Sequence, residues 1–287
     1  MLPLLEIPDS LISNQHLFVD AFFKSYPLRP SPLDLTLPDG RCRNYQFPTY
    51  FDKVQFSAGV FLCSYEQAAK HMPNADIKPV SALGRRAMVV VASYQYRKIH
   101  QMKGYNEVVV MIPVVNKEVN KGLNIPLLPP LIPGYPGAGY HVVALPMTSL
   151  ENMLRGQQFW GVPKTLHEVL IDHDGGNCVT RIQNEGGLDF ILRIPRQGKI
   201  INTDQKSRIF SMINNKPIQF KTHFKGMSQN TTNWNVLFRP WKEAGNAESL
   251  ELGRSPLAKV LKGLEINPEP FQTRYCNDLK SCLFLPE

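Results

Sequence analysis

The sequence predicts an α+β domain that is mostly antiparallel β, with a barrel-like sheet and a few short helices. Two observations support this fold class. The 24 prolines and 19 glycines are spread along the 287 residues, which is typical of short strands joined by turns. The chain also contains about ten strand-like runs but only about three short helical segments, and no repeat of fixed period.

The first part of the chain differs in character from the rest. Residues 1–46 are rich in proline and weakly periodic, so we expect an extended arm that wraps the body or a neighbouring subunit. One β-rich domain would then span residues 47–287. Its first strand is expected from Lys53 to Cys63. Ser64 can cap a short helix that ends near His71, because a proline follows closely.

The middle of the chain contains two almost continuous apolar, β-branched runs, at 88–94 and 108–115. This pattern is typical of buried strands. Residues 123–139 hold too many prolines to join a ladder or a helix, so a long apolar loop is expected there. A lid or subunit contact and a packed surface insertion are equally good interpretations of this loop.

A helix is expected after the loop. Thr148–Glu151 has the spacing of a capping box, and the helix that follows places Leu150, Met153 and Leu154 on one face. Gly156 is the expected C-terminal stop of this helix.

Further strands are expected at 166–172, 177–184, 187–195, 217–224, 234–239 and 248–252. A last helix should open at Ser255-Pro256, because proline suits the first helical position, and it should end just before Gly263.

Composition excludes several classes of protein. The net charge of +8 is spread over scattered pairs such as Arg85 and Arg86, so we expect a solvated surface without a nucleic-acid or membrane partner. The five cysteines are odd in number and lack framework spacing, which favours free thiols in a reducing compartment. Because we find no signal peptide, no apolar run of about 18 residues and no metal or nucleotide motif, we expect a cytoplasmic protein without metal or cofactor.

One segment carries a chemical signal: Gly156-Gln-Gln-Phe-Trp-Gly-Val-Pro-Lys164-Thr165. Three other stretches accompany it, namely Tyr50-Phe51 with the strand and helix that follow, Tyr105-Asn-Glu107 leading into Ile112-Pro-Val114, and Leu250 to Glu265. In order and spacing these four pieces resemble the acetoacetate decarboxylase superfamily. The resemblance covers roughly residues 47 to 266.

The resemblance implies that Lys164 forms an imine with the carbonyl group of the substrate and that Glu107 is the acid–base partner. A free lysine, with a pKa of about 10.4, is almost wholly protonated at neutral pH and is then not a nucleophile. As in acetoacetate decarboxylase, desolvation or a neighbouring cation would lower that pKa. The resemblance also implies a closed, cone-like sheet with the pocket inside, and a homo-oligomer. Expected pocket residues are Phe159, Trp160, Val162, Thr165 and Tyr105.

The sequence departs from the family pattern at polar positions. Thr165 stands where the family has a second lysine, and Gln157-Gln158 replaces an Arg-Glu pair. The family arginine that engages the substrate carboxylate would lie at Pro48-Thr49, and no acid in 88–94 matches a second family glutamate. Arg85, Arg97 or His100 could supply the missing cation, although a surface charge is the better interpretation of each.

The leading hypothesis is therefore a cofactor-independent, Schiff-base-forming carbon–carbon lyase for a small keto acid, with decarboxylation like that of the family. Two alternatives stay open. An aldolase- or dehydratase-type reaction could follow the same imine, or the chain could bind a hydrophobic ligand without catalysis.

Overall fold

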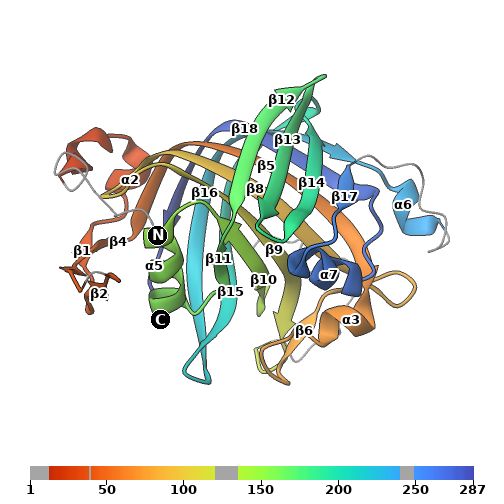
Figure 1. Ribbon diagram of the computed structural model, residues 1–287, viewed down its shortest axis with the longest axis horizontal. Helices are drawn as coiled ribbons and strands as arrows, with labels where there is room; N and C mark the ends of the chain where they lie inside the picture. The colour runs from red at the N-terminus through yellow and green to blue at the C-terminus, as the bar shows by residue number, and fades with distance from the viewer. Residues whose placement is uncertain (1–12, 39, 120–134, 240–248) are drawn as a thin grey trace.

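The computed structural model describes residues 13–38, 40–119, 135–239 and 249–287 (Figure 1). Within these residues a closed barrel of seven strands forms the centre of the fold. Each strand pairs with the next and the last returns to the first, in the order β10 (Ala138–Met147), β15 (Lys199–Ile213), β16 (Lys216–Thr232), β18 (Pro270–Leu283), β5 (Thr49–Ser64), β8 (Arg86–Ile99) and β9 (Tyr105–Asn116). All neighbours are antiparallel except β10 and β15, so the predicted fold class is confirmed.

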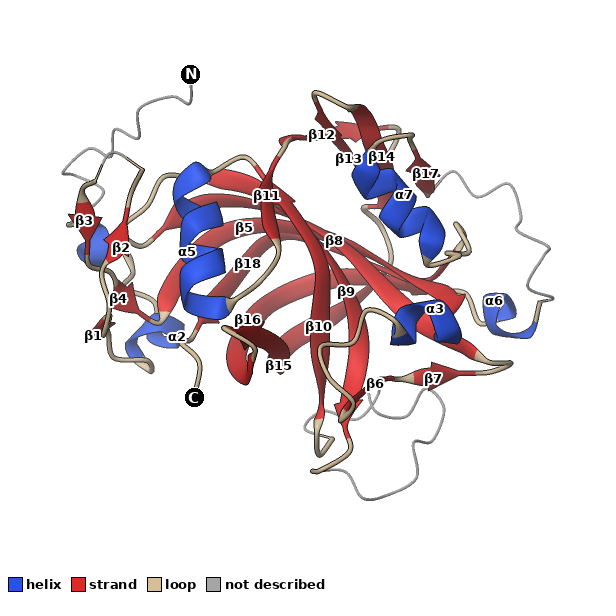
Figure 2. Ribbon diagram, turned by 60° about the horizontal axis from the view of Figure 1, so that its bottom comes forward, coloured by secondary structure: helices blue, strands red, loops and turns tan. Residues whose placement is uncertain are grey.

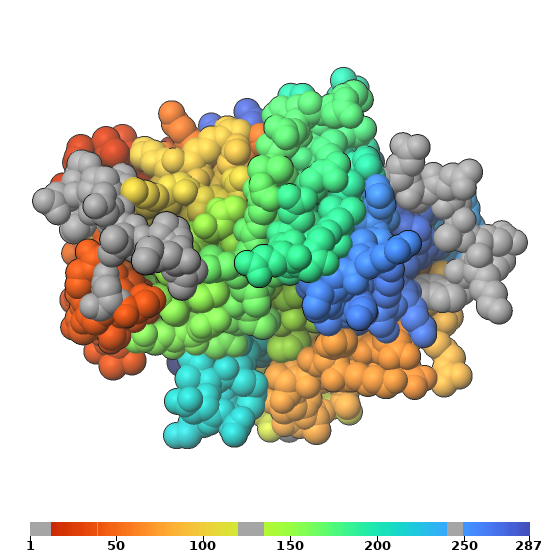
Figure 3. Space-filling model, viewed as in Figure 1, coloured from red at the N-terminus to blue at the C-terminus, as the bar shows by residue number. Residues whose placement is uncertain are grey.

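A second sheet covers part of the barrel's outside. It contains β12 (Glu168–Asp174), β13 (Asn177–Asn184), β14 (Gly187–Pro195) and β17 (Leu250–Leu252). In the space-filling view these residues and α7 (Pro256–Gly263) hide much of the barrel (Figure 3). Val91 and Val110 of the barrel belong to one buried cluster with Phe190 of the second sheet, whereas Val90 and Val109 belong to the interior cluster. Strands β8 and β9 are thus buried on both faces, which explains their continuous apolar runs.

The segment before the barrel contains η1 (Asn14–Leu17), α2 (Ala21–Lys24) and the two-residue strands β1 (Arg29–Pro30), β2 (Leu35–Thr36), β3 (Cys42–Arg43) and β4 (Gln46–Phe47). Phe22 and Phe23 cluster with Tyr50, and Tyr45 joins the main core. Figure 2 shows these short elements at one end of the molecule, beside α5 (Leu150–Trp160). The division into an arm (1–46) and a domain (47–287) stays a prediction.

Local signals located several elements correctly. Strands β13 and β14 match the predicted 177–184 and 187–195. Ser64 caps α3 (Tyr65–Ala69), and Ser255 caps α7, whose first residue is Pro256. Three small strands pair with the ends of barrel strands: β6 (Ile77–Pro79) with β9, β7 (Ser81–Ala82) with β8, and β11 (Lys164–Leu166) with β10.

Other expectations are corrected. Residues 234–239 do not form a strand, because Asn233 accepts a hydrogen bond from the backbone of Asn235 and starts the short helix α6 (Asn235–Phe238). Strands β10, β15 and β18 were not predicted. Most of the predicted loop 123–139 lies outside the described residues, and its last two residues belong to β10.

Helix α5 runs past its predicted stop. Ser149, and not Thr148, is its N-cap, and the helix continues through Gly156 to Trp160. It ends at Gly161, whose φ of 58° is left-handed. A Cβ atom at Gly161 would lie 2.0 Å from the carbonyl oxygen of Met212, so the tight approach of α5 to β15 requires glycine here.

Helix α5 also buries an unexpected face. Leu150, Met153 and Leu154 are only partly buried, whereas the polar residues Glu151 and Arg155 are fully enclosed. Arg43 and Tyr45 both donate hydrogen bonds to Glu151, so residues preceding the barrel satisfy the polar face of the helix. No helix among the described residues has the length and apolar character needed to span a bilayer.

Candidate active site

Lys164 stands at the first residue of β11, directly after the turn that ends α5. Strand β11 runs parallel to β10, with Lys164 opposite Leu145. The Gln157 side chain donates a hydrogen bond of 2.9 Å to the Lys164 carbonyl and fixes this backbone. The lysine stem lies across Gly156, where a Cβ atom would meet Lys164 Cδ at 2.1 Å. Gly156 therefore makes room for the amine inside the fold.

Glu107, on the inner face of β9, meets this lysine. Lys164 Nζ donates to Glu107 Oε2 over 3.4 Å, and each residue is only 6% exposed. The Tyr96 hydroxyl, on the neighbouring strand, donates to Glu107 Oε1 over 3.0 Å. Two residues 57 positions apart in the sequence are thus brought together away from solvent, and a phenol orients the carboxylate.

The pair faces a cavity of about 200 Å³ inside the barrel. Alternate residues of each strand form its wall, as expected for the two-residue period of a strand. Examples are Phe56, Ala58 and Val60 of β5 and Glu107, Val109 and Met111 of β9. Among the described residues on this wall, Glu107 is the only carboxylate and Lys164 and Arg274 are the only cations.

The predicted pocket residues divide into two groups. Tyr105, Trp160 and Val162 line the cavity. Phe159 does not line it. Its ring packs against the ring of Phe47, with ring centroids 5.5 Å apart. Thr165 does not either: it follows Lys164 in a strand, so its side chain points outward and is exposed. Phe159 and Thr165 thus lie outside the lining of this cavity.

Burial dominates the electrostatics of the pair. Desolvation lowers the pKa of Lys164, the Glu107 carboxylate acts in the opposite direction, and the positive charge of Arg155 lowers this pKa further. Burial, followed by the Glu107 carboxylate, raises the pKa values of Tyr96 and Tyr105, which keeps both phenols protonated. Lys164 therefore loses its proton more easily than a free lysine, and attack on a carbonyl requires the neutral amine.

Arg155 was not anticipated from the sequence. It is 1% exposed, stacks over Tyr45 at 4.3 Å from the ring centroid, and donates to Thr49 Oγ1 over 2.9 Å. Thr49 stands where the family pattern has an arginine, so a guanidinium from α5 occupies this region. It lies behind the cavity wall and acts on Lys164 through its charge. The only signal in the sequence was the position of Arg155 directly before Gly156, in the helix that leads to Lys164.

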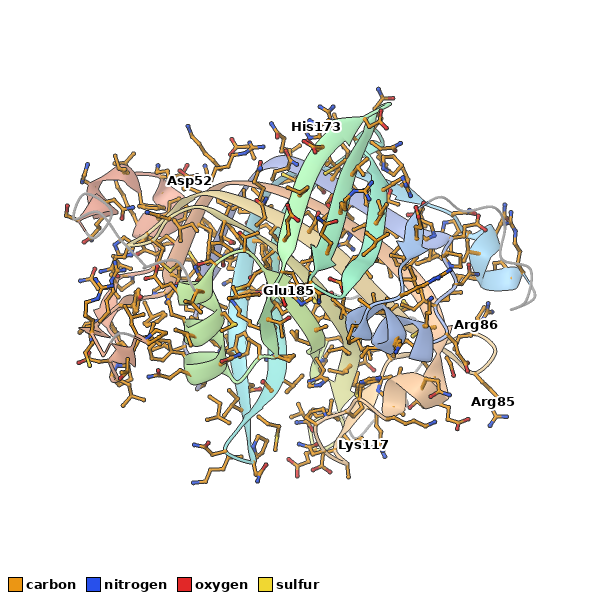
Figure 4. The ribbon with its side chains drawn as sticks, viewed as in Figure 1. Asp52, Arg85, Arg86, Lys117, His173 and Glu185 are labelled. Carbon is orange, nitrogen blue, oxygen red and sulfur yellow. The ribbon has the colours of Figure 1, made fainter. Side chains whose placement is uncertain are left out.

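The cations proposed from sequence are not at the cavity. Arg85 is exposed at the edge of the molecule (Figure 4), and Arg97 binds Gln55 on the outer face of the barrel. His100 packs against aromatic rings, and burial lowers its pKa to about 4. Among the described residues no cluster of three His, Cys, Asp or Glu side chains could hold a metal ion.

Exchanging Glu107 for glutamine is expected to separate its two effects. Because the carboxylate raises the pKa of Lys164, E107Q should shift the pH midpoint of imine trapping to lower pH. If Glu107 is the acid–base partner that the family resemblance implies, the maximal turnover should also fall about 10²- to 10⁴-fold. Cyanoborohydride trapping followed over pH measures the first effect. The exposed Glu185 (Figure 4) provides the matched control E185Q, and an unchanged or higher midpoint in E107Q contradicts the electrostatic argument.

Comparison with known proteins adds independent information. The family model described as acetoacetate decarboxylase (ADC) matches residues 34–218. Among solved structures, the chain is similar to acetoacetate decarboxylase from Legionella pneumophila subsp. pneumophila str. Philadelphia 1, with a TM-score of 0.59 and 14% identity over 88% of this chain and 92% of that chain. No curated protein matches the sequence.

Two further structures are similar. The enduracididine biosynthesis enzyme MppR, complexed with the condensation product of pyruvate and imidazole 4-carboxaldehyde, has a TM-score of 0.53 and 10% identity over 84% of this chain and 88% of that chain. An acetoacetate decarboxylase-like enzyme from Sphingomonas wittichii RW1 has a TM-score of 0.51 and 12% identity over 87% and 96%. At these identities the likeness shows a shared fold.

Proposed function

The chain belongs to the acetoacetate decarboxylase family, and from this premise we propose that it is a cofactor-independent lyase that forms an imine between Lys164 and a small keto acid or related carbonyl compound. One observation carries the proposal. An amine whose pKa is lowered by burial lies 3.4 Å from a carboxylate at the wall of a largely apolar cavity. Lowering the pKa of an amine increases its neutral, nucleophilic fraction at a given pH.

The chemistry follows from the positions of the two groups. The lone pair of Lys164 Nζ attacks the carbonyl carbon, and Glu107 acts as the general acid that delivers a proton to the carbonyl oxygen. Loss of water leaves a protonated imine, whose nitrogen accepts the electron pair of the carbon–carbon bond as carbon dioxide departs. Glu107, after it takes up a proton from solvent, protonates the enamine carbon. Attack of water on the imine then releases the ketone and restores the amine, and Glu107 accepts the proton set free.

A second reaction through the same imine is supported by the space beyond the pair. The cavity continues past Val109 and Met111 towards Met88 and Phe271, which leaves room for a second carbonyl compound. With Glu107 as the base, an enamine formed on Lys164 could attack that compound in an aldol or dehydratase-type reaction. The similar MppR structure holds a condensation product of pyruvate, which supports keeping this candidate.

Covalent trapping tests the proposal. Borohydride added with a panel of ketones and keto acids should reduce the imine and add the mass of one substrate to the peptide that contains Lys164. The exposed Lys70 provides a control, because K70M should leave trapping unchanged. Adducts at exposed lysines alone, or no adduct with any carbonyl compound of the panel, would contradict the proposal and leave the binding of a hydrophobic ligand without catalysis as the better explanation.

A further inference from the structure

One wall of the cavity differs in chemistry from the rest. Most of the lining is aliphatic or aromatic, but β15, β16 and β18 contribute a polar group of side chains: Thr203, Gln205, Ser207, Thr222, Gln272 and Arg274. Burying polar side chains inside a barrel is costly unless they find partners. A polar wall therefore indicates that the cavity recognises more than an apolar body.

Arg274 is the charged member of this wall. Its Nε donates to Gln272 Oε1 over 2.8 Å, and its Nη1 lies 3.4 Å from Gln205 Oε1. No carboxylate of the described residues pairs with it, whereas Arg43, Arg193 and Arg239 each pair with a glutamate. An arginine cannot lose its charge in a protein, unlike the buried Lys164. Its positive charge therefore remains at the cavity without a counter-ion from those residues.

Another residue of this wall has a side chain without a hydrogen-bond partner among the described residues. Thr222 is 7% exposed, and among the described residues its Oγ1 atom has no hydrogen-bond partner. It lines the same cavity as Arg274. Thr222 is not a neighbour of Arg274, because Thr222 is opposite Leu283 and Arg274 is opposite Asn230 in the ladder between β16 and β18. The guanidinium is therefore the group that a carboxylate would complete, because carboxylates accept bidentate bonds from arginine.

The topology places Arg274 across the barrel from the amine. Strand β18 is three strands from β9 around the seven-stranded ring, so Arg274 and Glu107 stand on opposite sides of the cavity. Through β5 and β8, Arg274 shares a register level with Val109, two residues beyond Glu107, which is roughly 7 Å along the strands. The charges of Glu107 and Arg274 both act on Tyr94. Burial and then Glu107 raise the pKa of Tyr94, whereas Arg274 lowers it.

We infer that Arg274 binds an anionic group of the substrate that lies several carbons from the carbonyl captured by Lys164. This inference rests on the proposed function and names its substrate class: a carbonyl compound with an apolar middle and a remote carboxylate. In a decarboxylation, this carboxylate is additional to the one that leaves as carbon dioxide. A small keto acid with one carboxylate beside its carbonyl would leave Arg274 unused.

Matched probes test the inference. Methyl ketones with a terminal carboxylate at increasing distance (4-oxopentanoate, 5-oxohexanoate and 6-oxoheptanoate) are compared with their methyl esters in the borohydride trapping assay. The wild-type protein should be half-saturated by its best carboxylate at a concentration at least about 10-fold lower than by the matching ester. The variant R274Q should lose about 10- to 100-fold in apparent affinity for that carboxylate and trap the ester as the wild type does.

Three further variants make the outcome decisive. R181Q removes a charge of the same type from an exposed position on β13 and should change nothing. T222V removes a hydroxyl of the same wall that lies far along the strands from Arg274, so it should affect the binding of the carboxylate and of its ester alike. R274K keeps the positive charge but cannot form the bidentate bonds of a guanidinium. Its apparent affinity for the carboxylate should lie between those of the wild type and R274Q.

The failure of this inference is distinguishable from that of the proposed function. If esters and carboxylates are trapped equally well and R274Q affects both alike, Arg274 is not the anionic subsite, although the imine chemistry stands. If neither series is trapped on Lys164, the proposed function itself fails. Thermal unfolding of each variant shows whether a loss reflects binding or folding.

Discussion

Replacing Lys164 with methionine is expected to abolish covalent trapping of ketones and to lower turnover by at least about 10³-fold. Methionine is close to the lysine stem in size and fills the space over Gly156 without an amine. The companion variant K164R keeps a positive charge near Glu107 but has no group that can be neutral at accessible pH. If K164R is as inactive as K164M, the nucleophile and not the charge is essential.

The same substitution has a consequence for stability. Because the folded protein lowers the pKa of Lys164, the unfolded chain binds more protons between that pKa and the ordinary value of 10.5. The free energy of unfolding should therefore rise with pH through this window, and K164M should lack this contribution. Urea unfolding of both proteins at several pH values measures the difference.

The turnover of K164M tests the catalytic role separately. A turnover within about tenfold of the wild type would overturn the assignment of Lys164 as the nucleophile.

Exchanging Gly156 for alanine is expected to lower the rate of imine trapping about 100-fold without unfolding the protein. The added Cβ would lie 2.1 Å from Lys164 Cδ and 2.4 Å from Cε, so the flexible lysine must move away from Glu107. Alanine itself favours the interior of helix α5 by about 1 kcal/mol over glycine. G156A should therefore lower the rate of trapping although alanine raises the helix propensity of α5.

Gly263 offers a control for this substitution. It lies in helix α7, and a Cβ there meets no atom within 4 Å, so G263A should leave both trapping and stability almost unchanged. Trapping rates and chemical denaturation of G156A and G263A are the measurements. A G156A protein that traps ketones at the wild-type rate would show that the position of Lys164 over Gly156 is not needed for reactivity.

Elements governed by short-range chemistry could be predicted. The caps at Ser64 and Ser255 depend on hydrogen bonds within three residues, and strands β13 and β14 are bounded by glycine turns. Strand β15 could not be predicted in this way. Its inner face carries Thr203, Gln205 and Ser207, so the alternation of apolar and polar residues is absent.

The buried polar face of α5 was missed for a related reason. Periodicity assigned the inner face to Met153 and Leu154, because apolar side chains are usually the buried ones. In the structure Arg43, Tyr45 and Thr49 supply hydrogen bonds for Glu151 and Arg155. These partners lie about 100 residues away in the sequence, so no local pattern reveals them.

By itself the sequence determined a β-rich chain with Lys164 directly after a helix and a tight turn, and with Glu107 on a separate apolar strand. Only the tertiary structure decided that the two side chains meet, that Arg155 stands behind them and that Arg274 faces the same cavity. The physical reason is that a closed barrel has an interior made of every second residue of seven strands. Pairing between segments far apart in the chain sets the register, and the register determines which charges share one space with little water.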